Sequence, residues 1–118
     1  MVKFIEMDDL DQMDSHAGPV ILINKFNMEP DDVDQFLKTW AADSAIMKRQ
    51  PGFICAQLHC GIAGSCVFLN YAVWESTEHF KRAFNNPEFQ SSIKGYSEGT
   101  AASPHLFKKV AVSAICVE

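Results

Sequence analysis

The sequence lacks the features that mark several large classes of protein. Its longest apolar runs, residues 20–23 and 110–117, have the length of a strand, whereas a helix that spans a bilayer needs about 20 apolar residues. Lys and Arg are scattered and the net charge is −5, so no basic face indicates a nucleic-acid partner. The first residues lack the apolar core and cleavage site of a signal peptide. We therefore expect a cytoplasmic protein that binds neither membrane nor nucleic acid.

Sequence motifs for cofactors and metals are also missing. There is no Gly-rich phosphate loop, no G-x-S-x-G or H-E-x-x-H motif, and no flavin or nicotinamide fingerprint. The histidines and carboxylates show no metal-ligand spacing, and the cysteines form no C-x-x-C pair. We therefore expect neither a cofactor nor a metal. An enzyme of this kind would work with amides, aromatic walls and an imidazole.

The four cysteines are Cys55, Cys60, Cys66 and Cys116. Three of them fall inside apolar strand patterns, and free Cys is commonly buried, so they are expected to be small buried hydrophobes kept reduced. Cys60 is the best candidate for a reactive thiol, because it lies next to His59 and a Gly-bearing turn.

What the chain does contain is a regular alternation of strand and helix patterns. Its 118 residues suit one domain, and 47% hydrophobic residues are enough for a core. The patterns predict strands at residues 20–26, 53–59, 66–74 and 106–117, with a helix up to about Arg49 and a second helical region at 76–93. This βαββαβ order predicts an α+β, ferredoxin-like fold with a four-stranded antiparallel sheet. Residues 1–18 are expected to be an acidic, irregular arm with a short extended piece at 3–7, and residues 19–118 the domain.

Turn and cap residues place the boundaries of these elements. Pro30 and the acidic residues after it suit the first turn of a helix, and Pro51-Gly52 follows its end. The stretch from Gly61 to Ser65 is a turn that makes the second and third strands an antiparallel hairpin. Ser76 is the expected N-cap of the next helix. Asn85-Asn86-Pro87 breaks that helix, and residues 95–104 are expected to be a loop.

The apolar pattern of the third strand predicts a partner subunit. Between Val67 and Trp74 both the odd and the even positions are largely apolar, so both faces of the sheet should be buried. A chain this short has too few helices to cover both faces. We therefore expect a homodimer, in which two bare sheet faces pack together as a dimeric α/β barrel. The long last strand is expected to extend along the partner.

Two asparagines and a tryptophan are the first candidates for a binding site. Asn24 and Asn70 lie on apolar strands, where an amide must be hydrogen-bonded or costs about 1–3 kcal/mol. Each is either tied to a loop backbone or faces a pocket, where it can donate to a carbonyl or an oxyanion. Trp74 is either a core anchor or the wall of a pocket for an aromatic ligand.

A second set of candidates lies on the second strand. Its alternation puts Gln57 and His59 on a mixed face with Phe53 and Cys55, and leaves a more apolar opposite face. A mixed face can line a wet cavity. A neutral imidazole there can act as a general base near pH 7, so His59 is a candidate base and Gln57 a candidate ligand contact.

Two short motifs resemble the antibiotic biosynthesis monooxygenase (ABM) family. They are the stretch Asn70-Tyr71-Ala72-Val73-Trp74-Glu75-Ser76, with the Phe80 helix after it, and Pro51-Gly52-Phe53. The resemblance covers roughly residues 19–94. It implies the dimeric ferredoxin-like barrel, which agrees with the pattern of strands and helices. These marks are structural as much as catalytic.

The resemblance also implies a chemistry. Family members include small enzymes that oxidise anthrones or hydroquinones with O2, without flavin or metal. In one branch the Asn and Trp that match Asn70 and Trp74 line the substrate pocket. That branch has a Tyr-His pair that here falls on Leu58 and His59, and a further Tyr that falls on Phe80. The haem-degrading branch has a first-strand Asn that matches Asn24, and a Trp and a His that fall on Ala83 and Ile93.

From these features we expect a cofactor-independent monooxygenase that acts on a small aromatic, quinol or anthrone-type substrate with O2. The expected catalytic residues are His59, Asn70 and Trp74, and the expected substrate contacts are Asn24, Gln57 and Phe80. The alternative is a non-catalytic dimeric module that binds a small molecule in the same pocket. Because the axial His is missing, haem degradation is not expected.

Overall fold

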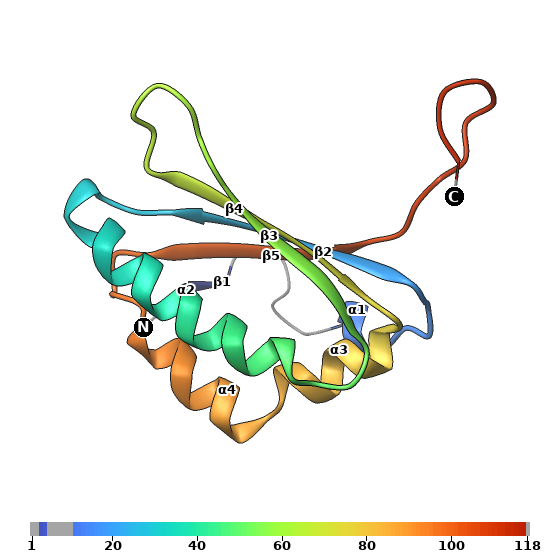
Figure 1. Ribbon diagram of the computed structural model, residues 1–118, viewed down its shortest axis with the longest axis horizontal. Helices are drawn as coiled ribbons and strands as arrows, with labels where there is room; N and C mark the ends of the chain where they lie inside the picture. The colour runs from blue at the N-terminus through green and yellow to red at the C-terminus, as the bar shows by residue number, and fades with distance from the viewer. Residues whose placement is uncertain (1–2, 5–10, 118) are drawn as a thin grey trace.

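The computed structural model describes residues 3–4 and 11–117 of the chain. Its strands are β1 (Lys3–Phe4), β2 (Val20–Asn27), β3 (Phe53–Cys60), β4 (Val67–Trp74) and β5 (Ala101–Phe107). Its helices are α1 (Asp11–Asp14), η1 (Pro30–Asp32), α2 (Val33–Lys48), α3 (Thr77–Phe84), α4 (Pro87–Ser92) and η2 (Ile93–Gly95). The predicted βαββαβ order is confirmed by β2, α2, β3, β4, the α3–α4 region and β5 (Figure 1).

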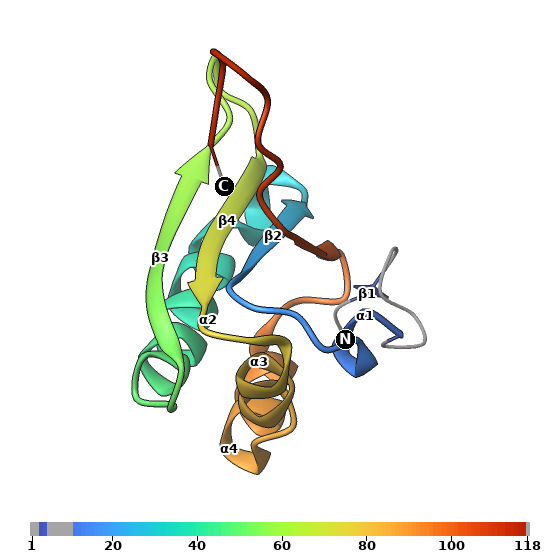
Figure 2. The same cartoon turned by 90° about the vertical axis from the view of Figure 1, so that its right-hand side faces the viewer.

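The sheet is one layer and the helices are the other. The strand order is β1-β5-β2-β4-β3. The four longer strands pair antiparallel with one another, and the short β1 pairs parallel with β5. Figures 1 and 2 show α2, α3 and α4 together on one side of the sheet. This is the ferredoxin-like arrangement that the sequence predicted. The opposite side of the sheet, which we call the outer face, carries no helix in either view.

The β3–β4 hairpin contains a bulge that changes which side chains share a face. Phe53 is opposite Trp74, but Cys55 is opposite Val73, so Ile54 is an extra residue. Phe53 therefore lies on the helix side with Ala56. The sequence pattern had placed Phe53 on one face with Cys55, Gln57 and His59, and that part of the prediction is wrong because simple alternation does not include a bulge.

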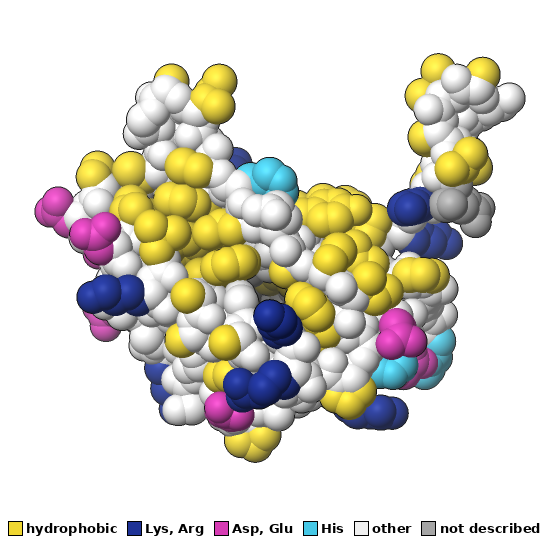
Figure 3. Space-filling model, viewed as in Figure 1, with side chains coloured by type: hydrophobic (Ala, Val, Ile, Leu, Met, Phe, Trp, Pro, Cys, Tyr) yellow, Lys and Arg dark blue, Asp and Glu magenta, His cyan; other side chains and the backbone are white. Residues whose placement is uncertain are grey.

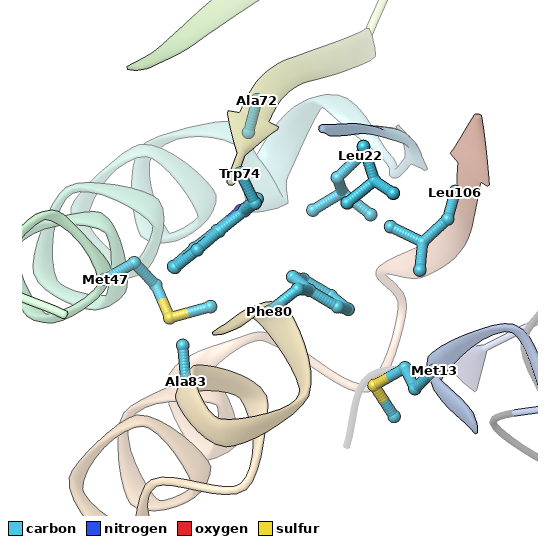
Figure 4. Packing of buried hydrophobic residues seen from close by; sticks show 9 residues of the cluster. Met13, Leu22, Met47, Ala72, Trp74, Phe80, Ala83 and Leu106 are labelled. Atoms are coloured by element: carbon cyan, nitrogen blue, oxygen red, sulfur yellow. The ribbon is translucent and has the colours of Figure 1, made fainter. Parts of the chain in front are cut away.

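Two groups of buried side chains fill the space between sheet and helices. One is aromatic and is built around Phe36, which contacts Phe26 and Phe68 at ring-centroid distances of 4.8 Å. The other joins the ends of the strands to α3, and Figure 4 shows Trp74 directed toward Met47 of α2 and Phe80 of α3. The Phe53 and Trp74 rings meet edge to face at 5.4 Å.

The segment before β2 is more structured than the sequence indicated. α1 places Met13 in the core, where the side chain is 1% exposed (Figure 4). The Gln12 amide accepts from the Leu106 amide N–H at 2.8 Å and donates to the Leu106 carbonyl at 3.1 Å, as a neighbouring strand would. The expected irregular arm is thus wrong for residues 11–14. Of the extended piece expected at residues 3–7, β1 accounts for residues 3–4, and residues 5–7 lie outside the described part of the chain.

The last strand is earlier and shorter than expected. β5 runs from Ala101 to Phe107, whereas the pattern had predicted a loop over 95–104 and a strand over 106–117. Residues 108–117 instead leave the sheet, with one isolated bridge between Val112 and Cys116 (Figure 1). The apolar composition of this segment was misleading because its apolar side chains are exposed, such as Val110 and Ile115.

The cysteines are not the buried residues that the pattern predicted. Cys55, Cys60 and Cys116 are exposed and Cys66 is half-buried, all as free thiols. Cys55 projects from the outer face of β3, Cys60 ends that strand, and Cys116 belongs to the exposed C-terminal segment. An apolar strand pattern does not tell a covered face from a bare one, which is why these thiols were misplaced.

The outer face is largely apolar. β2 and β4 present to it Ile21, Ile23, Leu69, Tyr71 and Val73, which are half-buried by their neighbours alone. The β3–β4 turn and residues 108–117 both rise on this side of the sheet (Figures 1 and 2). Figure 3 shows hydrophobic side chains over the strands and on both rising segments.

Candidate functional site

A cavity of about 80 Å³ lies between the helix side of the sheet and the helices. Its walls are mostly apolar, with a small number of polar side chains that point inward, as is usual for a ligand site. The lining residues on which the argument depends are Asn24, Asp43, Asn70, Trp74, Phe80 and Tyr96.

The two asparagines predicted from the sequence meet in this cavity. Asn24 of β2 and Asn70 of β4 are directly opposite each other in the antiparallel pair. Side chains so placed have Cβ atoms about 4.5–5.5 Å apart. The Oδ1 atoms of both are buried and have no hydrogen-bond partner among the described residues. Two hydrogen-bond acceptors are thus held side by side, where a ligand could donate hydrogen bonds to both.

Trp74 and Phe80 form an aromatic wall of the same cavity. Trp74 ends β4 and is 1% exposed, and its ring lies 5.8 Å from that of Phe80. Trp74 is therefore a core anchor that also lines the cavity. A flat apolar wall beside polar acceptors suits an aromatic ring that carries hydroxyl groups.

The structure does not bring Gln57 and His59 to this cavity. Both side chains are exposed on the outer face of β3, because the bulge fixes the parity of that strand. The His59 Nδ1 lies 3.3 Å from the Leu69 carbonyl oxygen, and Gln57 donates to the Leu58 carbonyl at 3.1 Å. The sheet separates them from Asn24, Asn70 and Trp74.

An ionisable pair that the sequence patterns did not single out also lines the cavity. The Tyr96 hydroxyl donates to Oδ2 of Asp43 at 2.5 Å, and both residues are buried. Burial raises the pKa of the Asp43 carboxyl to about 7, although the Tyr96 and Ser44 hydrogen bonds lower it. The pKa of Tyr96 is raised well above its usual range by burial and by the Asp43 charge, so the phenol stays protonated.

The signal that could have revealed Asp43 is its position on α2. The apolar side chains at residues 36, 40 and 47 define the face of this helix that lines the cavity or the core. Residue 43 falls on the same face, at helical spacing from both neighbours. A carboxylate within an apolar helical stripe costs free energy unless it is paired or hydrogen-bonded, so its position there is unusual.

A comparison with known protein families identifies the scaffold. The model of the family described as antibiotic biosynthesis monooxygenase matches residues 19–95, which is more than half of the chain. The chain belongs to the ABM family. The resemblance seen in the sequence is thereby confirmed. No curated protein shows significant sequence similarity to the chain.

Solved ABM-like structures share the fold. SnoaB, a cofactor-independent oxygenase from Streptomyces nogalater, is 24% identical with a TM-score of 0.74, over 83% of this chain and 99% of that chain. A putative monooxygenase from Shewanella loihica PV-4 is 29% identical with a TM-score of 0.68, over 80% and 97%. A putative antibiotic biosynthesis monooxygenase from Caulobacter crescentus CB15 is 16% identical with a TM-score of 0.72, over 80% and 92%.

The candidate site offers neutral polar groups and one ionisable pair. Within residues 3–4 and 11–117, no three His, Cys, Asp or Glu side chains gather closely enough to hold a metal ion. In that part of the chain no helix has the length and hydropathy needed to cross a bilayer. The cavity combines an apolar wall, two amides and a carboxylate–phenol pair. Such a set can bind a phenol, accept its proton and stabilise an oxyanion.

Proposed function

We propose that the protein is a cofactor-independent monooxygenase that oxidises a single-ring dihydroxyarene with O2. The observation that carries this proposal is the Asn24–Asn70 pair. It places two amide oxygens, without partners among the described residues, beside an aromatic wall in a mostly apolar cavity. Membership of the ABM family and the cofactor-independent oxygenase SnoaB among similar structures are consistent with it.

The amide pair explains why a hydroxylated ring is favoured. A buried amide oxygen without a partner costs about 1–3 kcal/mol, which a ligand hydroxyl recovers when it donates a hydrogen bond. The N–H groups of the same amides can donate to the oxyanion once the hydroxyl is ionised. Donors fixed in advance in a dry site stabilise developing charge more effectively than water does. The pair can therefore bind the substrate and favour its reactive form.

The volume of the cavity favours a small substrate. An engineered protein cavity of about 150 Å³ binds benzene, whereas this cavity measures about 80 Å³. One ring needs small shifts of the lining side chains, and a polycyclic anthrone needs the helices to move away from the sheet. We therefore place a monocyclic quinol ahead of an anthrone as the substrate.

The proposed reaction needs no external reductant. A base removes a hydroxyl proton, and the ring carbon beside the resulting oxyanion gives one electron to O2. The superoxide and the ring radical combine into a carbon–oxygen bond, and the proton returns to the distal oxygen. Loss of water, which carries away the ring hydrogen, leaves a carbonyl. The products are a hydroxyquinone and water, and the substrate supplies all the electrons.

We also propose that the protein is a homodimer. The apolar outer face, flanked by the β3–β4 turn and by residues 108–117, suits the same face of a second copy (Figures 1 and 3). Contiguous exposed apolar patches of this kind mark interaction sites. In such a dimer Gln57 and His59 lie at the interface.

Oxygen uptake tests the proposed activity. Chelator-treated protein is mixed with methylhydroquinone in an oxygen electrode, and product is followed by absorbance. We expect consumption of one O2 per hydroxyquinone formed, and a 100-fold or greater loss of kcat in Asn70→Ala, as is typical when an oxyanion donor is removed. Asn85→Ala is the matched control, because Asn85 is exposed and does not line the cavity.

Two outcomes argue against this function. If quinols raise the thermal midpoint of the protein but are never converted, the protein is the non-catalytic binding module instead. If Asn70→Ala and Asn85→Ala turn over equally fast, the Asn24–Asn70 pair does not carry the reaction. Uptake that disappears only when metal is removed contradicts the cofactor-independent chemistry.

A further inference from the structure

We propose that Asp43, held in place by Tyr96, is the group that accepts the hydroxyl proton of the substrate. This inference rests on the proposed function for the identity of the substrate. It assigns the base to α2 and to the segment after η2, rather than to the imidazole of His59 that the sequence suggested.

The position of Asp43 is the first reason. Its side chain lines the same cavity as Asn24, Asn70 and Trp74, and it is buried. His59 is exposed on the opposite side of the sheet. A general base must reach the proton that it removes, directly or through one water. Asp43 meets the requirement of a shared cavity, and within one chain His59 does not.

The hydrogen bonds of Asp43 are the second reason. Oδ2 accepts from the Tyr96 hydroxyl at 2.5 Å, while Oδ1 accepts from Ser44 at a long 3.3 Å. Tyr96 thus fixes one oxygen, and the other is only weakly engaged. A carboxylate oxygen has more than one acceptor site, so Oδ1 retains capacity for a ligand hydroxyl. Tyr96 itself is a donor, because its phenol stays protonated.

The charge environment of Asp43 is the third reason. Among the described residues that line the cavity, Asp43 and Tyr96 are the only ionisable ones, since β2, β3, β4, β5, α3 and α4 contribute neutral side chains. No cation in that lining compensates the carboxylate. Its pKa of about 7 therefore makes it a base matched to neutral pH. A buried titratable group of this kind in a cavity is a candidate for a chemical role.

A structural role is the competing explanation, in which the hydrogen bond only ties the segment after η2 to α2. Asp43→Asn separates the two, because an asparagine oxygen can still accept from Tyr96 but cannot take a proton. We expect the folded variant to lose at least 100-fold in kcat, in the range found for general bases. Asp34→Asn, exposed on the same helix, is the matched control and should keep wild-type kcat.

Anaerobic binding of methylhydroquinone tests the contact without any turnover. This quinol stays neutral between about pH 5.5 and 8.5. That range is roughly wide enough to titrate the Asp43 carboxyl around pH 7. In the wild type we expect the Kd to fall about tenfold as Asp43 ionises, because the carboxylate is the better acceptor. In Asp43→Asn the Kd should not depend on pH. Tyr96→Phe removes a donor to the carboxylate, so its transition should move to higher pH.

These results keep the two proposals apart. If the wild type shows pH-dependent binding that Asp43→Asn lacks, but no oxygen uptake, the oxygenase function fails and the Asp43 contact stands. If Asp43→Asn folds, binds with the wild-type pH dependence and keeps kcat within twofold, the assignment of Asp43 is overturned. Absence of quinol binding at pH 8.5 overturns it as well.

Discussion

At the scale of single residues, the cavity is distinguished by buried polar groups. Asn24 and Asn70 present buried amide oxygens to one another across two strands, and Asp43 keeps a carboxylate away from water. Each arrangement costs stability, because buried polar groups are normally fully hydrogen-bonded. Three such groups around one cavity are the reason why we propose it as the binding site.

The stability of the protein should therefore depend on pH through Asp43. Its pKa is 3.8 in the unfolded chain and about 7 in the fold, so between these values the folded state holds the extra proton. The free energy of unfolding contributed by this group falls as the pH rises from about 4 to 7, by an amount on the order of 4 kcal/mol at most. Urea unfolding of wild type and Asp43→Asn at pH 5 and pH 8 measures it.

The comparison of the two proteins isolates the carboxylate from all other titrating groups. Asp43→Asn should gain stability relative to the wild type at pH 8 and show no such gain at pH 5. Asp34→Asn serves as the reference for removing a carboxylate from the same helix without burial. Equal differences between wild type and Asp43→Asn at both pH values would mean that Asp43 has an ordinary pKa.

Cavity-lining residues that differ in type from the rest of their strand could be named from the sequence. Those that reach the cavity only through long-range contacts could not. Asn24, Asn70 and Trp74 interrupt or end apolar strands, so their types alone marked them. Alternation placed His59 on the same face of its strand as Phe53, and one bulge at Ile54 puts it on the other face. Asp43 became visible only when the fold put the helix face and Tyr96 on the same cavity.

At the scale of elements, the two family motifs are neighbours in space and support one turn. The Glu75 N–H donates to the Gly52 carbonyl at 2.8 Å, and Phe53 faces Trp74. Gly52 has φ +88, and a Cβ there would lie 2.3 Å from the His79 side chain. The Pro-Gly-Phe entry and the Trp-Glu-Ser exit therefore pack against each other, and Gly52 leaves no room for a side chain. This explains why they identify the scaffold more firmly than the reaction.

The Ser76 cap should contribute measurably to stability. Its Oγ accepts from the His79 backbone N–H at 3.1 Å and lies 2.7 Å from His79 Nδ1, at the start of α3. Removing an N-cap oxygen costs about 1 kcal/mol, so Ser76→Ala should lower the unfolding free energy by roughly that amount in urea. Ser91→Ala, exposed within α4, should change it by less than about 0.5 kcal/mol. Equal effects of the two variants would contradict the cap.

Local chemistry predicted the helices better than the last strand. Caps and breakers such as Pro30, Ser76 and Asn86 fix helix ends within the chain itself, and those ends were predicted closely. β5 begins with two alanines and contains Pro104, residue types that are depleted in strands, so its own residues argue against a strand. It forms because β2 pairs with it along seven positions, a long-range contact that no local pattern shows.

At the scale of the whole molecule, one layer of helices covers one side of the sheet and leaves the other bare. The two segments that rise on the bare side carry strongly exposed apolar residues, Ile62 at 89% and Ile115 at 80%. Such side chains lose little by exposure singly, but together they favour association. The apolar surface is continuous over the outer face, the β3–β4 turn and residues 108–117. In the dimer that we propose, a second copy of the chain covers all three.

A charge at the centre of the bare face should therefore prevent dimerisation while leaving the fold intact. Val73 lies on the outer face of β4 between Ile21 and Cys55 in the sheet register. In one copy alone, Val73→Glu remains near solvent, but in the dimer it would bury an unpaired carboxylate, which is strongly unfavourable. Light scattering during size exclusion should give a dimer for the wild type and a dissociation constant about 100-fold or more higher for Val73→Glu. Leu37→Glu, on the solvent side of α2, is the control and should stay dimeric. A monomeric wild type would show that the outer face is not the interface. A Val73→Glu variant that is as tightly dimeric as Leu37→Glu would show the same.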